Sequence, residues 1–532
     1  MHTECYPISI LPRLSRLFVD YAASREPLSP FYSAAPYGRG GATVERRGDS
    51  YAAIADLLET QNCGFGAGAA AMANIGKLRA GAPAMVTGQQ VTFFGGPLFT
   101  LLKAATAIRR AKDADAVPIF WLATEDHDLA EADHVTLPSR HELHTLRLEH
   151  ASEDAGKPVG CVKLGEGIGA LLEQAAELLG PGAALDALQA AYTPEATYAE
   201  AFGKFLATVF ADEGLILIDA AGREFHRLGS QVLRAAIERA AELEALLLER
   251  TRLLEERGYA AQVLVAQGGS LLFLIDEETG ARLALKRKDD ASGSEIWVAG
   301  KKLYTTAELL EILEREPERL SPNALLRPVF QDAILPTAAY VGGPAEIAYF
   351  AQSQVLYEQI LGRTTPVFPR LSATLVDAAM AKILTQYAVT IEDLMATHPD
   401  ELAQRLGSRA MPIEGRQKLA AAGNALDEEL KSVTEWMARL DAGLGKSAEV
   451  AAGKMRYQMD RLRRLATDYQ LQKEASLRKH VNALYLNLFP SDHPQERVVG
   501  AAAFLARQGA GLVAELVEIA AQECPGHKVV FL

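Results

Sequence analysis

The segment PAMVTGQQVTFFGGPLFTLLKAATAIRRAKDADAVPIFWLA, residues 83–123, decides the fold. It contains two short apolar runs of strand length, PAMVTG (83–88) and VPIFWLA (117–123). Between these runs, apolar residues recur at helical spacing, at Leu98, Leu101, Leu102, Ala105 and Ile108. Strand, helix and strand within about 40 residues predict a βαβ unit, and therefore a parallel sheet with a right-handed crossover.

Segments further along the chain extend this α/β pattern. GLILIDA (214–220) predicts a third buried strand, and residues 321–352 and 366–377 return to a mixed strand and helix pattern. Residues 258–300 instead contain short apolar runs separated by turn sequences, which predict an antiparallel β insertion. The runs expected as strands there are QVLVA (262–266), SLLFLID (270–276), ARLALKR (281–287) and EIWVAG (295–300).

The C-terminal part of the chain is predicted to be helical, with a coiled coil. Leu419, Leu426, Val433 and Leu440 recur every seven residues, and Leu430, Met437 and Leu444 form an interleaved set, so the seam from Leu426 has alternating spacings of four and three. Gly443 and Gly445 interrupt the pattern, and a second helix with an apolar stripe follows, so an antiparallel hairpin with a glycine turn is expected. Because the seam is only a few heptads long, we predict a homodimer that forms through this arm.

These patterns divide the chain into seven parts. The predicted parts are an N-terminal helical segment (1–80), the first part of a parallel-sheet core (81–150), a connecting insertion (151–200), a core continuation (201–250), a small β-rich insertion (251–320), the core return (321–380) and a helical domain (381–532) with an antiparallel coiled coil at about 415–480.

Composition excludes several classes of protein. With 54 basic and 68 acidic side chains the net charge is −14, which argues against a nucleic-acid-binding protein. No apolar run of about 18 residues occurs, so no membrane-spanning helix is expected. The four cysteines are scattered and form no CxxC motif, so we expect free thiols in a cytoplasmic protein rather than a disulfide scaffold.

Two strand ends carry polar residues suited to ligand binding. After the first strand come Gly88, Gln89 and Gln90, and then a glycine-proline turn, Gly96-Pro97, that opens the helix bearing Lys103. Glycine lets backbone amides approach a ligand, and a helix N-terminus attracts anions. We therefore expect a phosphate or carboxylate site here. The alternative is a tight turn with a solvated lysine.

After the second strand, four charged or titratable residues follow directly: Glu125, Asp126, His127 and Asp128. Histidine is suited to acid or base catalysis, while carboxylates hold a substrate amine or Mg²⁺ with a nucleotide. The alternative is a helix N-cap formed by Asp126 or Asp128. A second glycine-proline turn, Gly343-Pro344, places Glu346 in the first turn of a helix, either as a ligand contact or as a cap, and Tyr349 follows it.

Four segments, taken together, are similar to the BshC family of bacillithiol biosynthesis. They are VTGQQVTFFGGPLFTLLKAATAI (86–108), FWLATEDHDLAEADHV (120–135), LSPNALLRPVFQDAILPTAAYVGGPAEIAYFAQ (320–352) and PVFPRLSATLVD (366–377). The elements TGQQ, GPL, EDHD and GGPAEIAY occur in the order of that family, and the resemblance covers nearly the whole chain. One departure is that Leu102 precedes Lys103 where the family often has histidine.

The resemblance implies a Rossmann-like core with insertions like those of class I aminoacyl-tRNA synthetases, and a dimer formed by the coiled coil. It also implies a ligase that joins cysteine to the amine of glucosaminyl-malate in the cytoplasm, with ATP as the expected activator. Arg327 and Arg370 are then candidates to bind the malate carboxylates. The alternative is a nucleotide-binding assembly or regulatory protein whose coiled coil recruits a partner.

Overall fold

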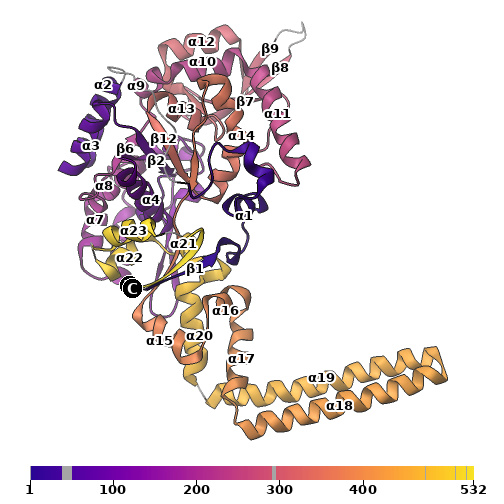
Figure 1. Ribbon diagram of the computed structural model, residues 1–532. Coiled ribbons are helices and arrows are strands. Elements are labelled where there is room, and N and C mark those ends of the chain that lie inside the picture. Colours follow the sequence, from indigo (N-terminus) through magenta and orange to yellow (C-terminus); the bar gives the residue numbers. More distant parts are fainter. Residues whose placement is uncertain (1, 39–50, 290–294, 474, 510, 523) are drawn as a thin grey trace. The chain divides into compact units, whose positions relative to one another are not determined.

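The computed structural model describes residues 2–38, 51–289, 295–473, 475–509, 511–522 and 524–532 (Figure 1). They form two compact units: the larger comprises Thr3–Thr374 and Pro494–Val530, and the smaller consists mainly of Leu375–His493. The predicted helical domain, 381–532, spans most of the smaller unit and also includes residues that belong to the larger one. Residues after 493 return to the larger unit, where strand β15 (Gly526–Phe531) pairs between β1 (His2–Pro7) and β14 (Ser372–Val376). The strand β1 also lies in a segment that was predicted to be helical.

The larger unit is built on a five-stranded sheet with the order β13-β12-β2-β3-β6, in which every neighbouring pair is parallel. The strands are β2 (Ala84–Gln89), β3 (Val117–Leu122), β6 (Ile216–Asp219), β12 (Thr337–Gly342) and β13 (Val367–Pro369). The predicted βαβ unit is confirmed, because β2 and β3 pair in register with α4 (Phe99–Asp113) between them in the chain. All six residues of β3 are buried, as expected for an apolar strand covered on both faces.

Helices from several parts of the chain cover this sheet. The helix α4 packs against β2, β3 and β12, while α2 (Ala52–Phe65), α3 (Ala69–Arg79) and α8 (Tyr198–Val209) pack near β6. The helix α14 (Pro344–Leu361) lies against β12 and β13. The other helices of at least six residues in this unit are α1 (Arg16–Ala22), α6 (Ile168–Leu179), α7 (Ala183–Ala191), α9 (Arg223–Leu228), α10 (Ser230–Glu238), α11 (Ala240–Glu256), α12 (Thr306–Arg315), α13 (Arg327–Ile334), α22 (Ala501–Gln508) and α23 (Gly511–Ala521).

The predicted β insertion is present as an antiparallel sheet with the order β10-β9-β8-β7-β11. Its strands are β7 (Gly269–Ile275), β8 (Arg282–Asp289), β9 (Glu295–Ala299), β10 (Lys302–Tyr304) and β11 (Leu320–Pro322). The expected strand at 262–266 is wrong. Both backbone groups of Val263 bond to the side chain of Gln352 on α14, so this segment is tied to a helix instead of a sheet. A separate hairpin is formed by β4 (His134–Pro138) and β5 (Leu143–Arg147).

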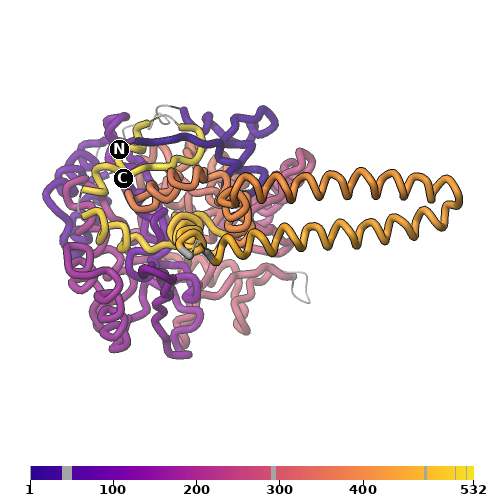
Figure 2. Tube along the Cα trace, turned by 90° about the horizontal axis from the view of Figure 1, so that it is seen from below, coloured from indigo at the N-terminus to yellow at the C-terminus, as the bar shows by residue number. Residues whose placement is uncertain are grey.

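The smaller unit is helical and contains the predicted hairpin, which consists of α18 (Ile413–Leu440) and α19 (Ala442–Lys473) (Figures 1 and 2). The turn between them is at Asp441 rather than at the glycines. Asp441 is extended, and its side chain accepts the Leu444 amide at 2.9 Å, so it caps α19. Gly445 lies inside α19, where a Cβ atom would come within 2.7 Å of the Ala438 Cβ, so this glycine permits close packing of the helices. The remaining helices are α15 (Ala378–Tyr387), α16 (Ile391–Ala396), α17 (Pro399–Ala410) and α20 (Ala475–Leu488).

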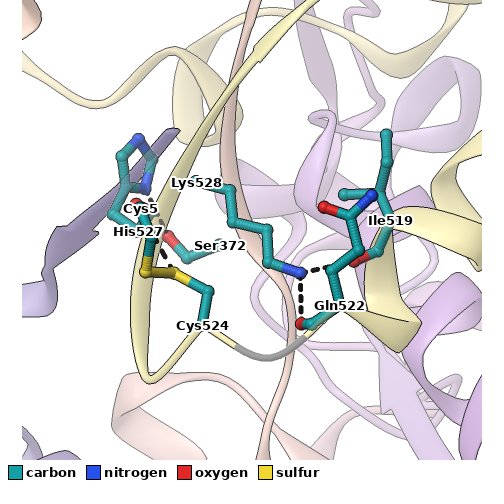
Figure 3. Close-up of a disulfide and its surroundings, with 7 residues drawn as sticks. All are labelled: Cys5, Ser372, Ile519, Gln522, Cys524, His527 and Lys528. Carbon is teal, nitrogen blue, oxygen red and sulfur yellow. Dashed lines mark hydrogen bonds between the residues drawn. A yellow bond between two sulfur atoms is a disulfide. The ribbon is translucent and has the colours of Figure 1, made fainter. Parts of the chain in front are cut away.

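The expectation of four free thiols is wrong. Cys5 on β1 and Cys524, which precedes β15, form a disulfide (Figure 3). The two residues are separated by 519 positions, and pairing of β1 with β15 is what brings them together. Cys63 and Cys161 remain free and exposed. No helix within the described ranges is both long enough and apolar enough to cross a membrane.

Candidate active site

The strand order places a topological switch point between β2 and β12. From β2 the chain proceeds through β3 to β6, and it then returns to the other side of β2 to form β12 and β13. In open parallel sheets, ligands bind outside the carboxyl ends of the strands at such a point. Thr87 is opposite Val341 in the two strands, so the TGQQ and GGPAE segments that follow them lie side by side.

Lys103 and Glu346 form a buried ion pair at this switch point. Lys103 Nζ lies 2.5 Å from Glu346 Oε2, and it also donates to the Gly88 carbonyl at 2.7 Å and to Gln89 Oε1 at 2.9 Å. Burial alone would raise the pKa of Glu346, but the Lys103 ammonium outweighs it and holds the pKa of this carboxyl below its ordinary value. Lys103 thus pairs with a carboxylate of the protein itself, although burial lowers the pKa of its own ammonium.

Glu346 combines the two roles that its sequence position left open. Its Oε2 accepts the Gly343 amide at 2.7 Å, which caps α14, and its Oε1 accepts the Tyr340 hydroxyl at 2.6 Å. Tyr340 was not singled out in the sequence, because as an apolar-flanked residue inside β12 it resembles a core aromatic. The capping residue is therefore also the acidic centre of the polar cluster.

Arg327 lies beside this cluster at the start of α13. Its Nη2 donates to the Tyr349 hydroxyl at 3.1 Å, and its Nη1 donates to Gln331 Oε1, also at 3.1 Å. The guanidinium carbon is 5.9 Å from the centre of the Trp121 ring, which favours a cation there. The structure therefore brings together Arg327 and Tyr349, two of the residues predicted to bind substrate.

Arg370 is held by a partner that the sequence reading missed. Its Nη2 donates to Glu496 Oε1 at 2.7 Å, and both side chains are buried. Glu496 also accepts the Ala373 amide at 2.8 Å and the Ser372 hydroxyl. Burial would raise the pKa of Glu496, but the Arg370 charge outweighs it and keeps the pKa below its ordinary value. Arg370 therefore already has a carboxylate partner before any substrate binds.

The switch point contains more cations than anions. Three cations and two carboxylates share it: Lys103, Arg327 and Arg370, with Glu346 and Glu496. The space beside Gly343 is bounded by three of these side chains, because a Cβ atom built there would lie 3.4 Å from Glu346 Oε2, 3.7 Å from Arg370 Nε and 3.8 Å from Lys103 Cε. A buried excess of positive charge favours an anionic ligand.

The glycine-proline turn before α4 does not form the anion site that its sequence predicted. The Gly96 amide donates to the Phe93 carbonyl at 3.0 Å, and the Leu98 amide donates to Val499. The Gly96 carbonyl accepts the Ala501 amide, and Pro97 pairs with Gly500 as an isolated bridge. Gly96 is buried, and a Cβ atom there would lie 2.1 Å from Thr92 Oγ1. Gly96 and Pro97 therefore pack the helix start against the C-terminal segment.

A second polar cluster lies at the carboxyl ends of β3 and β6. Glu125 Oε1 is 3.0 Å from Nε2 of His226, whose side chain is fully buried on α9. Burial lowers the pKa of His226, but the Glu125 carboxylate outweighs it and the net shift is upward. Next to them, Thr124 Oγ1 donates to Asp219 Oδ1 at 2.5 Å. His226 was missed in the sequence, where only its position soon after the strand ending in Asp219 could have marked it.

The other three residues of the EDHD motif have separate partners. Asp126 Oδ2 accepts the Gln90 side-chain amide at 2.6 Å, which links this cluster to the end of β2. Asp128 accepts the Glu131 amide at 3.2 Å and caps the short helix α5 (Leu129–Ala132), as the structural alternative proposed. The ring of His127 lies near Arg282 of the β insertion, with 3.2 Å between Nδ1 and Nη1.

Family comparisons match the chain from end to end. A family described as "Bacillithiol biosynthesis BshC, N-terminal Rossmann-like domain" matches residues 1–371, and "Bacillithiol biosynthesis BshC, C-terminal coiled-coil domain" matches residues 373–532. The chain belongs to the BshC family. Its relatives include the "Putative cysteine ligase BshC" of Koribacter versatilis, which is 41% identical over 100% of both chains, and that of Solibacter usitatus, which is 34% identical over 99% of both.

Membership of the BshC family confirms the Rossmann-like core and the coiled-coil domain predicted from sequence, and it identifies the protein as an enzyme of the ligase class. Likeness of the insertions to those of aminoacyl-tRNA synthetases stays a prediction. The BshC coiled-coil match begins at residue 373, close to the start of the smaller unit, but it extends past residue 493 into the strands and helices of the larger one.

Proposed function

We propose that the protein joins the carboxyl group of L-cysteine to the amine of glucosaminyl-malate and so forms bacillithiol, with a nucleotide activating the carboxylate. Two facts support this proposal: the named BshC relatives carry the name "Putative cysteine ligase BshC", and the switch point carries three cations against two carboxylates. The charge excess is the observation that carries the assignment of the site, since cysteine carboxylate, malate and nucleotide are all anions.

The nucleotide phosphate is proposed to bind beside Gly343. Lys103 supplies a cationic donor there, and Gln89 Oε1 is the Lys103 partner that an incoming phosphate oxygen would replace most easily, because it is uncharged. ATP would convert the cysteine carboxylate, a poor electrophile, into an activated acyl group. Mg²⁺ binds nucleotides largely through phosphate oxygens and keeps several waters, so it would enter with the nucleotide rather than through a dedicated protein cage.

The amine of glucosaminyl-malate is proposed to bind at the second cluster. An ammonium group is attracted by the acids at the ends of β3 and β6, of which Glu125 and Asp219 are partly buried. The amine must lose a proton before it attacks the activated carboxyl group, and a carboxylate within hydrogen-bond reach can accept it. Asp128 is less suited, since its carboxylate already caps α5.

Arg327 is the stronger candidate for the malate carboxylates. Arg370 is neutralised by Glu496, so a second carboxylate would compete with an existing ion pair. Arg327 has hydroxyl and amide partners but no direct carboxylate partner among its described hydrogen bonds. We therefore assign Arg327 to substrate binding. Arg370 is assigned a structural role, as one of the side chains that pack beside Gly343.

The test uses the purified full chain with cysteine, glucosaminyl-malate, ATP and Mg²⁺. Bacillithiol is measured by mass spectrometry, and AMP and ADP by chromatography. We expect bacillithiol and one nucleotide product in equal amounts, and neither when cysteine is omitted. The variant Arg327→Met should raise KM for glucosaminyl-malate, while the matched surface variant Arg315→Met should not. Absence of both bacillithiol and nucleotide turnover would overturn the proposal.

A further inference from the structure

The β insertion sends one side chain to the EDHD motif, and that side chain constrains what His127 can do. Arg282 is the first residue of β8, and each of the three nitrogens of its guanidinium has a partner. Its Nε donates to the Ser321 hydroxyl and its Nη2 to the Pro322 carbonyl, both at 2.8 Å. The remaining nitrogen, Nη1, lies 3.2 Å from His127 Nδ1. Arg282 is therefore fixed in place rather than free to adapt to the imidazole.

Aromatic packing fixes the same geometry from the other side. The guanidinium carbon of Arg282 is 3.8 Å from the centre of the Phe273 ring, and the His127 ring lies 5.4 Å from that ring, centre to centre. Phe273 belongs to β7 of the insertion. The insertion thus supplies both the cation that faces His127 and the surface on which the two groups rest.

Hydrogen-bond chemistry then selects one form of His127. A guanidinium has five N–H donors and no acceptor, so Nδ1 must accept from Arg282 with its lone pair. The proton of the neutral imidazole is then on Nε2. A hydrogen on Nδ1 would point at the N–H groups of the guanidinium, so the 3.2 Å contact fits only a ring in which Nδ1 carries no hydrogen.

The neighbouring acid does not reverse this assignment. Asp126 Oδ1 is 3.9 Å from His127 Nδ1, which is beyond hydrogen-bond distance. This oxygen accepts the Asp128 amide at 3.2 Å, and the other oxygen accepts from Gln90. Both carboxylate oxygens are thus directed to other donors, and Arg282 is the nearer partner of the ring.

We propose that Arg282 is a positioning residue that holds His127 as a neutral imidazole with its proton on Nε2, so that His127 acts as a hydrogen-bond donor and not as the base. This role rests on the proposed ligase reaction. There, the amine attacks the activated carboxyl group, and the Nε2–H of His127 donates to the carboxyl oxygen that gains negative charge. The proton of the amine goes instead to a carboxylate at the end of β3, Glu125 or Asp126.

The first experiment needs no substrate and so does not depend on the proposed function. Long-range ¹⁵N–¹H spectra of protein labelled with ¹⁵N-histidine report which ring nitrogen carries the proton, and the His127 signals are those that vanish in His127→Gln. We expect the Nε2–H tautomer near pH 7 in the wild-type chain. In Arg282→Met, which keeps the stem but removes the donors, a mixture of tautomers should appear, and Arg282→Lys should restore the wild-type form in part. An Nδ1–H tautomer in the wild type, or an unchanged spectrum in Arg282→Met, would overturn the proposal.

The second experiment separates a donor from a base. Glutamine keeps an N–H donor but is not basic. The kcat of His127→Gln should therefore be at least about ten times the kcat of His127→Ala. Removal of a transition-state donor typically lowers kcat by more than this factor. Equal loss in both variants would contradict the donor role. If the spectra show the Nε2–H tautomer and yet no bacillithiol forms, the proposed function fails while the assignment of the tautomer stands.

Discussion

Lys103 on α4 and Glu346 on α14 meet at 2.5 Å across the switch point of the parallel sheet. The pair joins two helices that are far apart in the chain. Glu346 also caps α14 by accepting the Gly343 amide, and it accepts the hydroxyl of Tyr340. Because both groups are buried, each depends on the other to remain charged.

Breaking this pair on one side should therefore be costly. We expect Lys103→Met and Glu346→Gln each to lower the free energy of unfolding by about 3–5 kcal/mol, since the remaining group is left buried without its partner. The double variant should lose less than the sum of the two single losses. Urea unfolding measures all three. The exposed pair Arg239–Glu242 is the control, and its loss should cost much less, because solvent screens an exposed pair. Strict additivity for Lys103 and Glu346 would contradict the coupling.

His527 should make the fold sensitive to acid. It is fully buried between the hydroxyls of Ser372 and Thr374, and burial lowers its pKa to about 4. The unfolded chain takes up this proton near pH 6.5, so the stabilisation is present above that value and is lost as the pH falls towards 4. The difference corresponds to about 3 kcal/mol. In His527→Gln, the urea midpoint should fall less between pH 7 and about 4.5 than in the wild type. An identical fall in both proteins would show that His527 is not the group responsible.

The disulfide between Cys5 and Cys524 predicts a specific thiol count. Titration of the native protein prepared without reductant should find two reactive thiols, Cys63 and Cys161, and reduction under denaturing conditions should reveal four. Cys524→Ser should lower the stability of the oxidised protein by about 2–5 kcal/mol. The same substitution should have little effect on the reduced protein. Four reactive thiols in the oxidised native protein would contradict the pairing.

The exposed face of the hairpin predicts self-association. Within the described part of α18 and α19, large apolar side chains remain exposed, among them Trp436, Leu440, Leu462 and Tyr469. Exposed apolar surface of this extent is typical of an interface. We propose a homodimer, and sedimentation should report twice the chain mass. Trp436→Lys should shift the protein to the monomer, while Glu428→Lys, a charge change at a polar exposed position, should not. A monomeric wild type would disprove the dimer.

Periodicity was sufficient to predict the scaffold. The apolar runs 83–88 and 117–123 became β2 and β3 because a strand covered by helices on both faces is apolar throughout, and the heptads became α18 and α19. The run at 262–266 failed because one buried side chain, Gln352, offers the backbone of Val263 the hydrogen bonds that a strand would have offered. No local pattern contains that information.

The candidate site was predicted in part, for a similar reason. Lys103 and Glu346 could be identified separately from their positions after strands, but their mutual contact depends on the strand order. Glu496, His226 and Arg282 were missed because each reaches the site from a segment with no motif of its own. Gly96 was misinterpreted, since its amide donates to a carbonyl within the protein. Its own carbonyl accepts the Ala501 amide of the C-terminal segment, a contact that only the packed structure shows.

The central position of β15 between β1 and β14 has a consequence for synthesis on the ribosome. Strand β1 stays without its partner until β15 has been synthesised, and the whole helical unit is synthesised between the two strands. A nascent chain that stops before residue 494 also lacks Glu496, which leaves Arg370 without its carboxylate. The larger unit therefore reaches this set of contacts only after β15 has been made, and until then β14 presents an unpaired strand edge.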